Sequence, residues 1–175
     1  GSIGNDQPIP QGDTFYADLP QHGYDPDKAR ALLREAGHDG LEIELSTADG
    51  AFPGAVDMAQ LFAQSAAKAG IKVKVNRAAD DSYWDVIWMK KPFYMSWFGG
   101  RPTADMMLTL AYSTGSSWND TFFSDPDFDR LLTDARVSKD LEKRRKMYAE
   151  MQRIIAETGG YIIPVFANTI DAHTD

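Results

Sequence analysis

The stretch LEIELSTADGAFPGAVDMAQLFAQSAAKAGIKVKV, residues 41–75, decides the fold of this chain. At its two ends, residues 41–45 and 71–75 alternate apolar and charged side chains with a period of two, which is typical of half-buried strands. Between them, apolar residues recur at helical spacing from Met58 until Gly70. A right-handed crossover of this length sets the two strands parallel. The stretch therefore predicts a β-α-β unit.

The charges on the two strands also predict how the strands pair. If they are neighbours in register, Glu42 and Glu44 share a face with Lys72 and Lys74. Opposite charges that face each other across a sheet contribute ~0.2–1 kcal/mol per contact. We assign this pairing a structural role and no chemistry.

Periodicity and capping residues predict further helices and strands. Asp25 can cap a helix that begins at Pro26 and ends before Gly37. Other helices are expected over residues 80–90, from a cap at Ser124 or Asp125 to Ala135, and from Ser138 to the Gly159-Gly160 pair, and other strands over residues 92–97 and 161–166. This order predicts an α/β fold: a mixed sheet with a β-α-β unit, flanked by helices.

The N-terminal part has a different composition. Residues 4–24 hold three prolines and three glycines without a sustained period, and Gly1-Ser2 is typical of the scar that tag cleavage leaves. We expect residues 1–23 to be a linker segment and residues 24–175 to form one α/β lobe. A chain of 175 residues with 43% hydrophobic content is long enough for one core.

Charge and composition exclude several classes of protein. The formal net charge is −8, and no segment gathers enough Lys or Arg for a basic stripe, so we expect no nucleic-acid partner. The chain has no cysteine, which excludes disulfides and thiol nucleophiles. No apolar run approaches the ~18–20 residues that span a bilayer, so we expect no membrane insertion.

The Gly99-Gly100-Arg101 turn is the best candidate for a ligand site. Open α/β sheets bind ligands beyond the carboxyl ends of their strands, and glycine lets backbone N–H groups approach closely. Arg101 would supply a fixed cation for a carboxylate or a phosphate. The other candidates are aromatic or polar neighbours along the chain, namely Trp97, Phe98, Trp118 and Asn119. We expect Trp84 and Trp88, spaced four residues apart, to be core residues instead.

Catalytic and metal sites have little support in the sequence. The histidines, His22, His38 and His173, form no pair at ligand spacing, so we expect no metal and no cofactor. The serines near Gly115 do not form a nucleophile elbow. Five acids could form a carboxylate pair: Asp105, Asp120, Asp125, Asp127 and Asp129. Three of these acids stand where a helix N-terminus attracts acids anyway, so we expect no enzyme.

Several short motifs, in series from Tyr24 to Phe166, resemble a known family. They are YDPDKARALL at residues 24–33 with Ala36-Gly37, WFG at residues 97–99, FDRLL at residues 128–132, and residues 144–152 leading to Ile163-Pro164. The series resembles the C-terminal lobe, of domain III type, of the family 5 extracellular solute-binding proteins. This family serves ABC importers of peptides, nickel and opines.

The resemblance implies one lobe of a periplasmic-binding-protein fold, class II and cluster C-like. It further implies a two-lobed protein in the periplasm, or lipid-anchored outside the cell, that captures a small polar solute for an ABC permease without catalysis. The N-terminal lobe of the same protein would then be missing from these 175 residues. We therefore expect a fragment excised between its hinge strands.

One departure from the family pattern bears on the ligand. Peptide-binding members resemble one another in an acidic residue after the Trp-x-Gly turn, which holds the α-ammonium group of the peptide. This chain has Gly100 there, followed by Arg101. The exchange reverses the local field, so we expect an acidic or neutral polar group at this end of the solute, as in an opine, a sugar acid or an acidic peptide derivative.

Two alternative functions remain open at this point. The same type of lobe occurs as the ligand-sensing module of regulators, in which case a DNA-binding domain would replace the signal peptide. An acidic hydrolase would need two carboxylates with divergent pKa values in one pocket.

Overall fold

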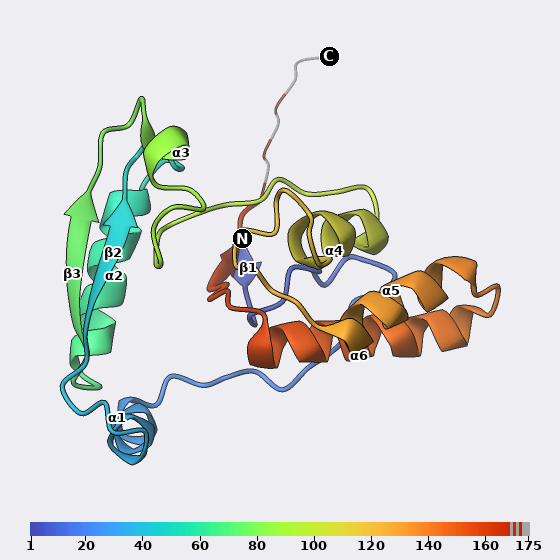
Figure 1. Cartoon of the computed structure of the whole chain (residues 1–175), viewed down its shortest axis with the longest axis horizontal. Helices are drawn as coiled ribbons and strands as arrows, with labels where there is room; N and C mark the ends of the chain where they lie inside the picture. Colours follow the sequence, from blue (N-terminus) through green and yellow to red (C-terminus); the bar gives the residue numbers. More distant parts are fainter. Residues whose placement is uncertain (169, 171, 173–175) are drawn as a thin grey trace. The chain divides into compact units, whose positions relative to one another are not determined.

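The computed structural model describes residues 1–168, 170 and 172 (Figure 1). The chain divides into two compact units. The first unit combines Gly1–His22 with Gly100–Asp175, and the second is Gly23–Gly99. Whether residues 24–175 act as one lobe of a larger protein stays a prediction.

The second unit contains the predicted β-α-β arrangement. Its elements are α1 (Pro26–Glu35), β2 (Glu42–Thr47), α2 (Ala55–Ala67), β3 (Lys72–Arg77) and the short α3 (Tyr83–Val86). Strands β2 and β3 pair in parallel. The register sets Glu42 opposite Lys72 and Glu44 opposite Lys74, as predicted. The Lys72 Nζ lies 2.7 Å from the Glu42 Oε1.

Helix α1 begins where its sequence predicts. The Asp25 carboxylate accepts a hydrogen bond of 2.9 Å from the Lys28 N–H, and Pro26 occupies the first helical position. Gly37 follows the helix with φ +75°, in the left-handed region that glycine adopts without strain. None of the residues of α1 is buried, and Leu32 is 55% exposed.

The strand predicted over residues 92–97 does not form. A single parallel bridge joins Tyr94 to Ser46, at the edge of β2. The Tyr83 hydroxyl donates a hydrogen bond of 2.7 Å to the Met95 carbonyl, so a side chain satisfies this backbone group in place of a neighbouring strand. The segment therefore lies beside β2 without extending the sheet.

The helix predicted over residues 80–90 is also much shorter, because only α3 is helical. The apolar core around it includes Ala48, Ala55, Tyr83 and Ile87. Trp84 does not belong to this core, contrary to the prediction, since it is 39% exposed and its indole N–H donates to the Gly50 carbonyl at 3.2 Å.

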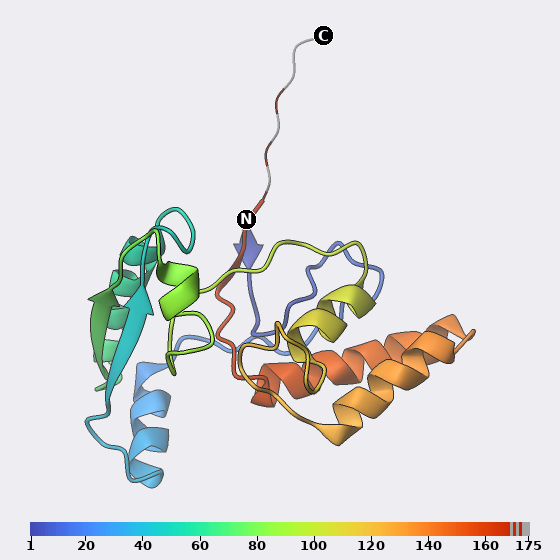
Figure 2. The same ribbon diagram turned by 45° about the horizontal axis from the view of Figure 1, so that its top comes forward.

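The first unit is mainly helical (Figure 2). It consists of β1 (Ser2–Ile3), α4 (Ala104–Tyr112), α5 (Pro126–Val137), α6 (Leu141–Thr158) and β4 (Val165–Phe166). Strands β1 and β4 pair antiparallel. The fold class is α/β as predicted, with one small parallel sheet in one unit and one small antiparallel sheet in the other.

Helix α5 begins at the predicted Asp125 cap, and α6 begins later than predicted. The Asp140 carboxylate accepts hydrogen bonds from the Glu142 and Lys143 N–H groups, at 2.9 and 3.1 Å, and so caps α6 in place of Ser138. A carboxylate at this position also complements the helix dipole. The last strand is shorter than predicted, since β4 begins only after Pro164, which has no N–H to donate.

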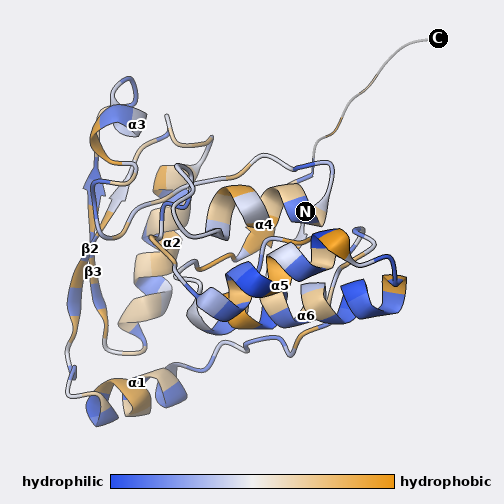
Figure 3. Cartoon of the chain, turned by 45° about the vertical axis from the view of Figure 1, so that its right-hand side comes forward, coloured by the Kyte–Doolittle hydropathy of each residue, from blue (hydrophilic) through white to orange (hydrophobic). Residues whose placement is uncertain are grey.

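The sequence analysis did not predict α4. Thr103 caps it by accepting a hydrogen bond of 3.2 Å from the Met106 N–H. Figure 3 shows α4 as mostly hydrophobic, whereas α5 and α6 carry many hydrophilic residues. Met107, Leu108 and Tyr112 of α4 are buried in the core of the first unit. Among the described residues, no helix combines the length and the apolar character that a membrane crossing requires.

The N-terminal segment is extended, and it packs into the first unit. Ile9 is 1% exposed. The buried Gln7 side-chain amide accepts a hydrogen bond from the Ile9 N–H at 2.6 Å and donates one to the Ile9 carbonyl at 2.7 Å. Farther along, Gln152 of α6 accepts from the Ala17 N–H at 2.9 Å and donates to the Phe15 carbonyl at 2.7 Å. The segment is thus part of the core of the first unit.

Candidate functional site

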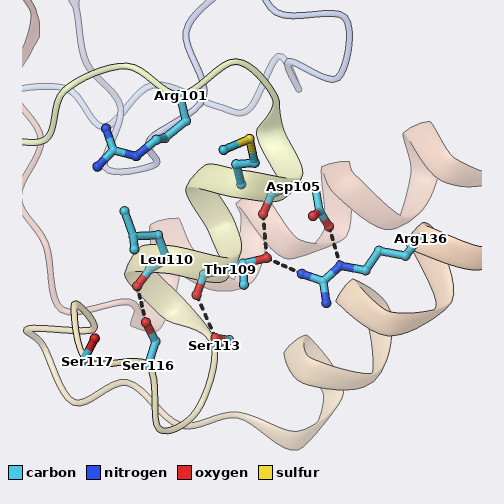
Figure 4. A pocket seen from close by; sticks show the side chains of 9 residues that line it. Arg101, Asp105, Thr109, Leu110, Ser113, Ser116, Ser117 and Arg136 are labelled. Atoms are coloured by element: carbon cyan, nitrogen blue, oxygen red, sulfur yellow. Dashed lines mark hydrogen bonds and ion pairs between the residues drawn. The ribbon is translucent and has the colours of Figure 1, made fainter.

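A groove of about 550 Å³ runs along α4, entirely within the first unit (Figure 4). Its lining residues come from α4, from the segments that precede and follow it, and from α5. They are Arg101, Asp105, Met106, Thr109, Leu110, Ser113, Ser116, Ser117 and Arg136. The volume lies within the ~300–1,000 Å³ that is usual for small-molecule sites.

An ion pair forms one side of the groove. The Arg136 Nε of α5 donates to the Asp105 Oδ1 of α4 at 2.8 Å, and the Arg136 guanidinium also donates to the Thr109 hydroxyl. The Tyr148 hydroxyl donates to the same Asp105 oxygen at 3.5 Å. Burial raises the pKa of Tyr148, so it stays a neutral donor near pH 7. These contacts hold Asp105 and Arg136 in place.

Arg101 lies on the other side of the groove. Figure 4 shows its side chain on the opposite side of α4 from Arg136. Met106 and Leu110 supply apolar surface to the groove, and Met106 is 48% exposed. The lining thus holds two cations and one anion, a net charge of +1, in a chain whose net charge is −8.

A loop rich in serine closes the end of the groove. The Ser113 hydroxyl donates to the Thr109 carbonyl, and the Ser116 hydroxyl donates to the Leu110 carbonyl, each at 2.6 Å. Both bonds tie the loop to the last turn of α4. The next aromatic residue, Trp118, is 46% exposed, and its backbone N–H donates to the Ser116 hydroxyl at 3.4 Å.

Asn119 holds this loop from inside. It is 4% exposed, its Oδ1 accepts from the Phe123 N–H at 3.0 Å, and its Nδ2 donates to the Phe123 carbonyl at 2.7 Å. The Nδ2 also donates to the Ser113 carbonyl at 3.2 Å. The geometry therefore assigns Asn119 to the support of the loop that carries Trp118.

The predicted turn contributes to both units. Trp97, Phe98 and Gly99 belong to the second unit, in which Trp97 is 57% exposed, and Gly100 and Arg101 belong to the first. Gly100 does not have a left-handed backbone, and a Cβ added there would meet no atom within 4 Å. The fold does not require glycine at this position.

The acids that could have formed a catalytic pair have structural partners. Asp125 caps α5 at 2.9 Å, Asp127 pairs with Arg130 at 2.8 Å, and Asp129 accepts from the Thr114 N–H at 3.1 Å. Asp105 pairs with Arg136, while Asp120 is buried. The geometry gives the hydrolase hypothesis no carboxylate pair to build on.

Two of the three histidines, His22 and His38, lie in the described part of the chain, and neither belongs to a group of three or more possible metal ligands there. His22 lies 3.5 Å from Asp6, and His173 lies outside the described residues. In the described part of the chain, no three His, Asp or Glu side chains are grouped as metal ligands would be.

A second hollow, of about 350 Å³, lies on the sheet of the second unit. Its lining residues are Glu42, Ile43, Glu44, Lys72, Val73 and Lys74. The charges there neutralise one another, because Lys72 pairs with Glu42 and Lys74 with Glu44. This hollow therefore offers less to a charged ligand than the groove along α4.

Several residues of the groove were not among the predicted site residues. Met106, Thr109 and Leu110 could have been found, because Thr103 followed by apolar residues at helical spacing indicates a capped helix. Arg136 could not, since only the packing of α5 beside α4 brings it to Asp105.

Comparisons with known proteins identify relatives of this chain. Residues 1–120 match the sequence model of the bacterial extracellular solute-binding proteins, family 5 Middle. The Di/tripeptide-binding protein 2 of Pseudomonas aeruginosa is 31% identical over 145 residues, which is 77% of this chain and 27% of the relative. The Glutathione-binding protein GsiB of Salmonella choleraesuis is 28% identical over 163 residues, which is 86% of this chain and 32% of the relative.

Solved structures share the fold. HbpA2 from Haemophilus parasuis has a TM-score of 0.79 at 25% identity and covers 93% of this chain. The periplasmic binding protein DppA from Helicobacter pylori, solved with the peptide STSA, has a TM-score of 0.75 at 24% identity and covers 90% of this chain. This chain covers 34% and 32% of those two structures. It likewise spans about a third or less of the length of the curated relatives that it matches.

Proposed function

Because the chain belongs to family 5 of the bacterial extracellular solute-binding proteins, we propose that it is a ligand-binding lobe of the substrate-binding protein of an ABC importer. The lobe captures a peptide-like, opine-like or other small polar solute and releases it chemically unchanged. The family match over residues 1–120 carries this proposal, since it includes every residue that lines the groove along α4 except Arg136. The family consists of binding proteins and not of enzymes.

The names of the relatives support a solute of peptide size. The Pseudomonas relative is named for di- and tripeptides, and the Salmonella relative is named for glutathione. Glutathione has two carboxylates, one more than a tripeptide with neutral side chains. Peptide-binding members carry an acidic residue at the position of Gly100. Because this chain has no carboxylate there and has Arg101 next to it, a solute with an acidic or neutral polar group fits the pair.

We propose that the solute contacts the predicted turn and the loop that follows α4. In this proposal Trp97, Phe98, Gly99 and Gly100 contribute aromatic and backbone surface, and Arg101 contributes the cation. Trp118 adds a second aromatic side chain, and Asn119 acts through the position of Trp118. Exposure supports the roles of the two tryptophans, because each leaves about half of its surface accessible.

The family supports a proposal for the partners and the place of action. Its members are periplasmic or extracellular, bind small solutes and work with ABC permeases. For this protein we propose a permease partner, a second lobe in the same protein that covers the solute, and either a periplasmic location or a lipid anchor on the cell surface.

Native mass spectrometry of the full-length protein, purified from its source without added ligand, tests the proposal. We expect a longer protein whose mass drops on mild denaturation, as a small polar molecule is released. The released molecule identifies the solute. A protein little longer than 175 residues that releases nothing would contradict the proposed function.

A further inference from the structure

We propose that the groove along α4 binds the carboxylate end of a solute whose adjoining group is apolar. The inference rests on the proposed function and deepens it, because it assigns one subsite and a chemical class to the solute. It is carried by the charges and the apolar surface of the groove.

The charges favour an anion. Arg136 is held by Asp105 at 2.8 Å and by Thr109, so it acts as a fixed positive neighbour at one side. Arg101 lines the opposite side and has the planar fork of donors that fits a carboxylate. Asp105 is engaged by Arg136 and is not placed to receive an ammonium group. An anion therefore finds net positive charge here, within an otherwise acidic chain.

The hydroxyl groups of the groove add no donor next to Arg101. Ser113 and Ser116 use their protons on the carbonyls of Thr109 and Leu110. Ser117 also lines the groove, and in the part of the chain that the structure describes no hydrogen bond holds its hydroxyl. Figure 4 shows Ser117 in the loop at the far end of the groove from Arg101, so we assign the carboxylate to Arg101 and not to Ser117.

The floor of the groove suits an apolar group. Met106 and Leu110 stand four residues apart and so lie on one face of α4. Met106 is 48% exposed, which is a large exposed fraction for a methionine, and its flexible thioether can adapt to different shapes. A solute that buries an alkyl group on this floor can place its carboxylate near Arg101.

The experiment uses a pair of probes that differ only in charge. The amide ¹H–¹⁵N NMR spectrum of the 175-residue protein is recorded during titration with N-acetyl-L-leucine, and separately with N-acetyl-L-leucinamide. N-acetyl-L-leucine has an alkyl side chain and a carboxylate but no ammonium group. We expect it to shift the amides of Arg101, Met106 and Leu110, with a Kd about tenfold lower than that of the amide.

Matched variants assign the contacts. Arg101→Ala should raise the Kd for N-acetyl-L-leucine about tenfold and leave the Kd for the neutral analogue nearly unchanged. Arg145→Ala changes the net charge equally, but it lies on the exposed side of α6, paired with Glu142 at 2.5 Å, and should have no effect. Met106→Gln should weaken both probes, whereas Met106→Leu should weaken neither.

Three outcomes would overturn the inference. These are equal affinity for the two probes, shifts centred on residues 42–44 and 72–74, and the same loss in the Arg145 variant as in the Arg101 variant. If the full-length protein releases a solute while the groove does not respond to N-acetyl-L-leucine, the subsite is wrong and the proposed function stands. If the groove binds the probe but the full-length protein yields no solute, the proposed function fails.

Discussion

Gln152 of α6 and Ala17 of the N-terminal segment are 135 residues apart in the sequence and are joined by a hydrogen bond of 2.9 Å. The same amide donates to the Phe15 carbonyl at 2.7 Å and to the Tyr148 carbonyl at 2.9 Å. One buried side chain thus satisfies three backbone groups and fixes the N-terminal segment on α6.

Replacement of this amide should destabilise the first unit. In Gln152→Leu the Ala17 N–H stays buried and the Phe15 carbonyl partly buried without a partner, and each such group costs up to about 1–3 kcal/mol. We expect the free energy of unfolding to fall by about 2–4 kcal/mol, measured by urea denaturation. Gln64→Leu, on the exposed side of α2, is the control and should change it by less than about 0.5 kcal/mol. Equal effects of the two substitutions would show that the amide does not fix the segment.

Asn119→Ala should loosen the loop that carries Trp118. The substitution removes the bonds to the backbone of Phe123 and to the Ser113 carbonyl, which are buried or partly buried. We expect a loss of about 2–4 kcal/mol in stability. With Trp84, Trp88 and Trp97 replaced by phenylalanine, the remaining Trp118 fluorescence should shift toward the emission of a fully solvated indole. Thr133→Ala, an exposed substitution on α5, is the comparison. Unchanged emission from Trp118 would mean that the loop keeps its position without the amide.

Tyr83 should make the second unit sensitive to alkaline pH. Burial raises the pKa of Tyr83 from 10.0 to about 12. Between these values the unfolded chain has lost the tyrosine proton and the folded chain retains it, so stability falls as the pH rises. A shift of this size corresponds to a loss of roughly 2–3 kcal/mol.

Replacing Tyr83 by phenylalanine separates its contribution to the alkaline loss of stability from the contributions of the other tyrosines. Tyr83→Phe removes the hydroxyl that bonds to the Ser46 and Met95 carbonyls, so it should cost about 1–2 kcal/mol at pH 7. Its stability should then decline less between pH 10 and 12 than that of the unsubstituted protein. Tyr24→Phe, at a ring that is 65% exposed, should keep the full decline. An identical alkaline slope in Tyr83→Phe and the unsubstituted protein would contradict the assignment.

The fold was predictable where local pattern and pairing agree. Alternating charges predicted the register of β2 and β3, because each lysine on one strand finds its partner only in that register. The start of α1 was equally predictable, since an aspartate followed by a proline is typical of an N-cap and the first helical position. By contrast, α4 was missed: it is apolar on most of its surface, so its polar face is a weak signal and the Thr103 cap was the clearer one.

The contacts between distant residues could not be predicted. Nothing in the composition of the N-terminal segment indicates that Gln152 will fix it, because the pair forms only when α6 is packed. The same limit applies to the groove: the sequence indicated Arg101 as a cation in a loop, but the ion pair of Asp105 with Arg136 depends on how α5 lies beside α4. Only the local half of the candidate site could therefore be predicted.

Arg101 should determine the affinity of the full-length protein for an anionic solute. If the two lobes exclude water from the contact, Arg101→Ala leaves the solute carboxylate without its partner. We expect a loss of about 2–5 kcal/mol in binding free energy, measured by calorimetry with the released solute. Arg130→Ala, on the exposed face of α5, should change nothing. Unchanged affinity in Arg101→Ala would remove this residue from the site.

Gly100→Asp should shift the preference of the site away from anions. The position tolerates a side chain, because an added Cβ meets no atom within 4 Å and the backbone is not left-handed. The variant should therefore fold with nearly unchanged stability. Its carboxylate would stand beside Arg101, neutralise the local positive charge and restore an acid where peptide-binding members carry one. We expect the full-length variant to bind the anionic solute at least tenfold more weakly, while Gly100→Asn, which has the same size without the charge, binds within about twofold of the unsubstituted protein. Equal losses in the two variants would mean that the side chain acts by its bulk, and the electrostatic account of ligand choice at this turn would then be wrong.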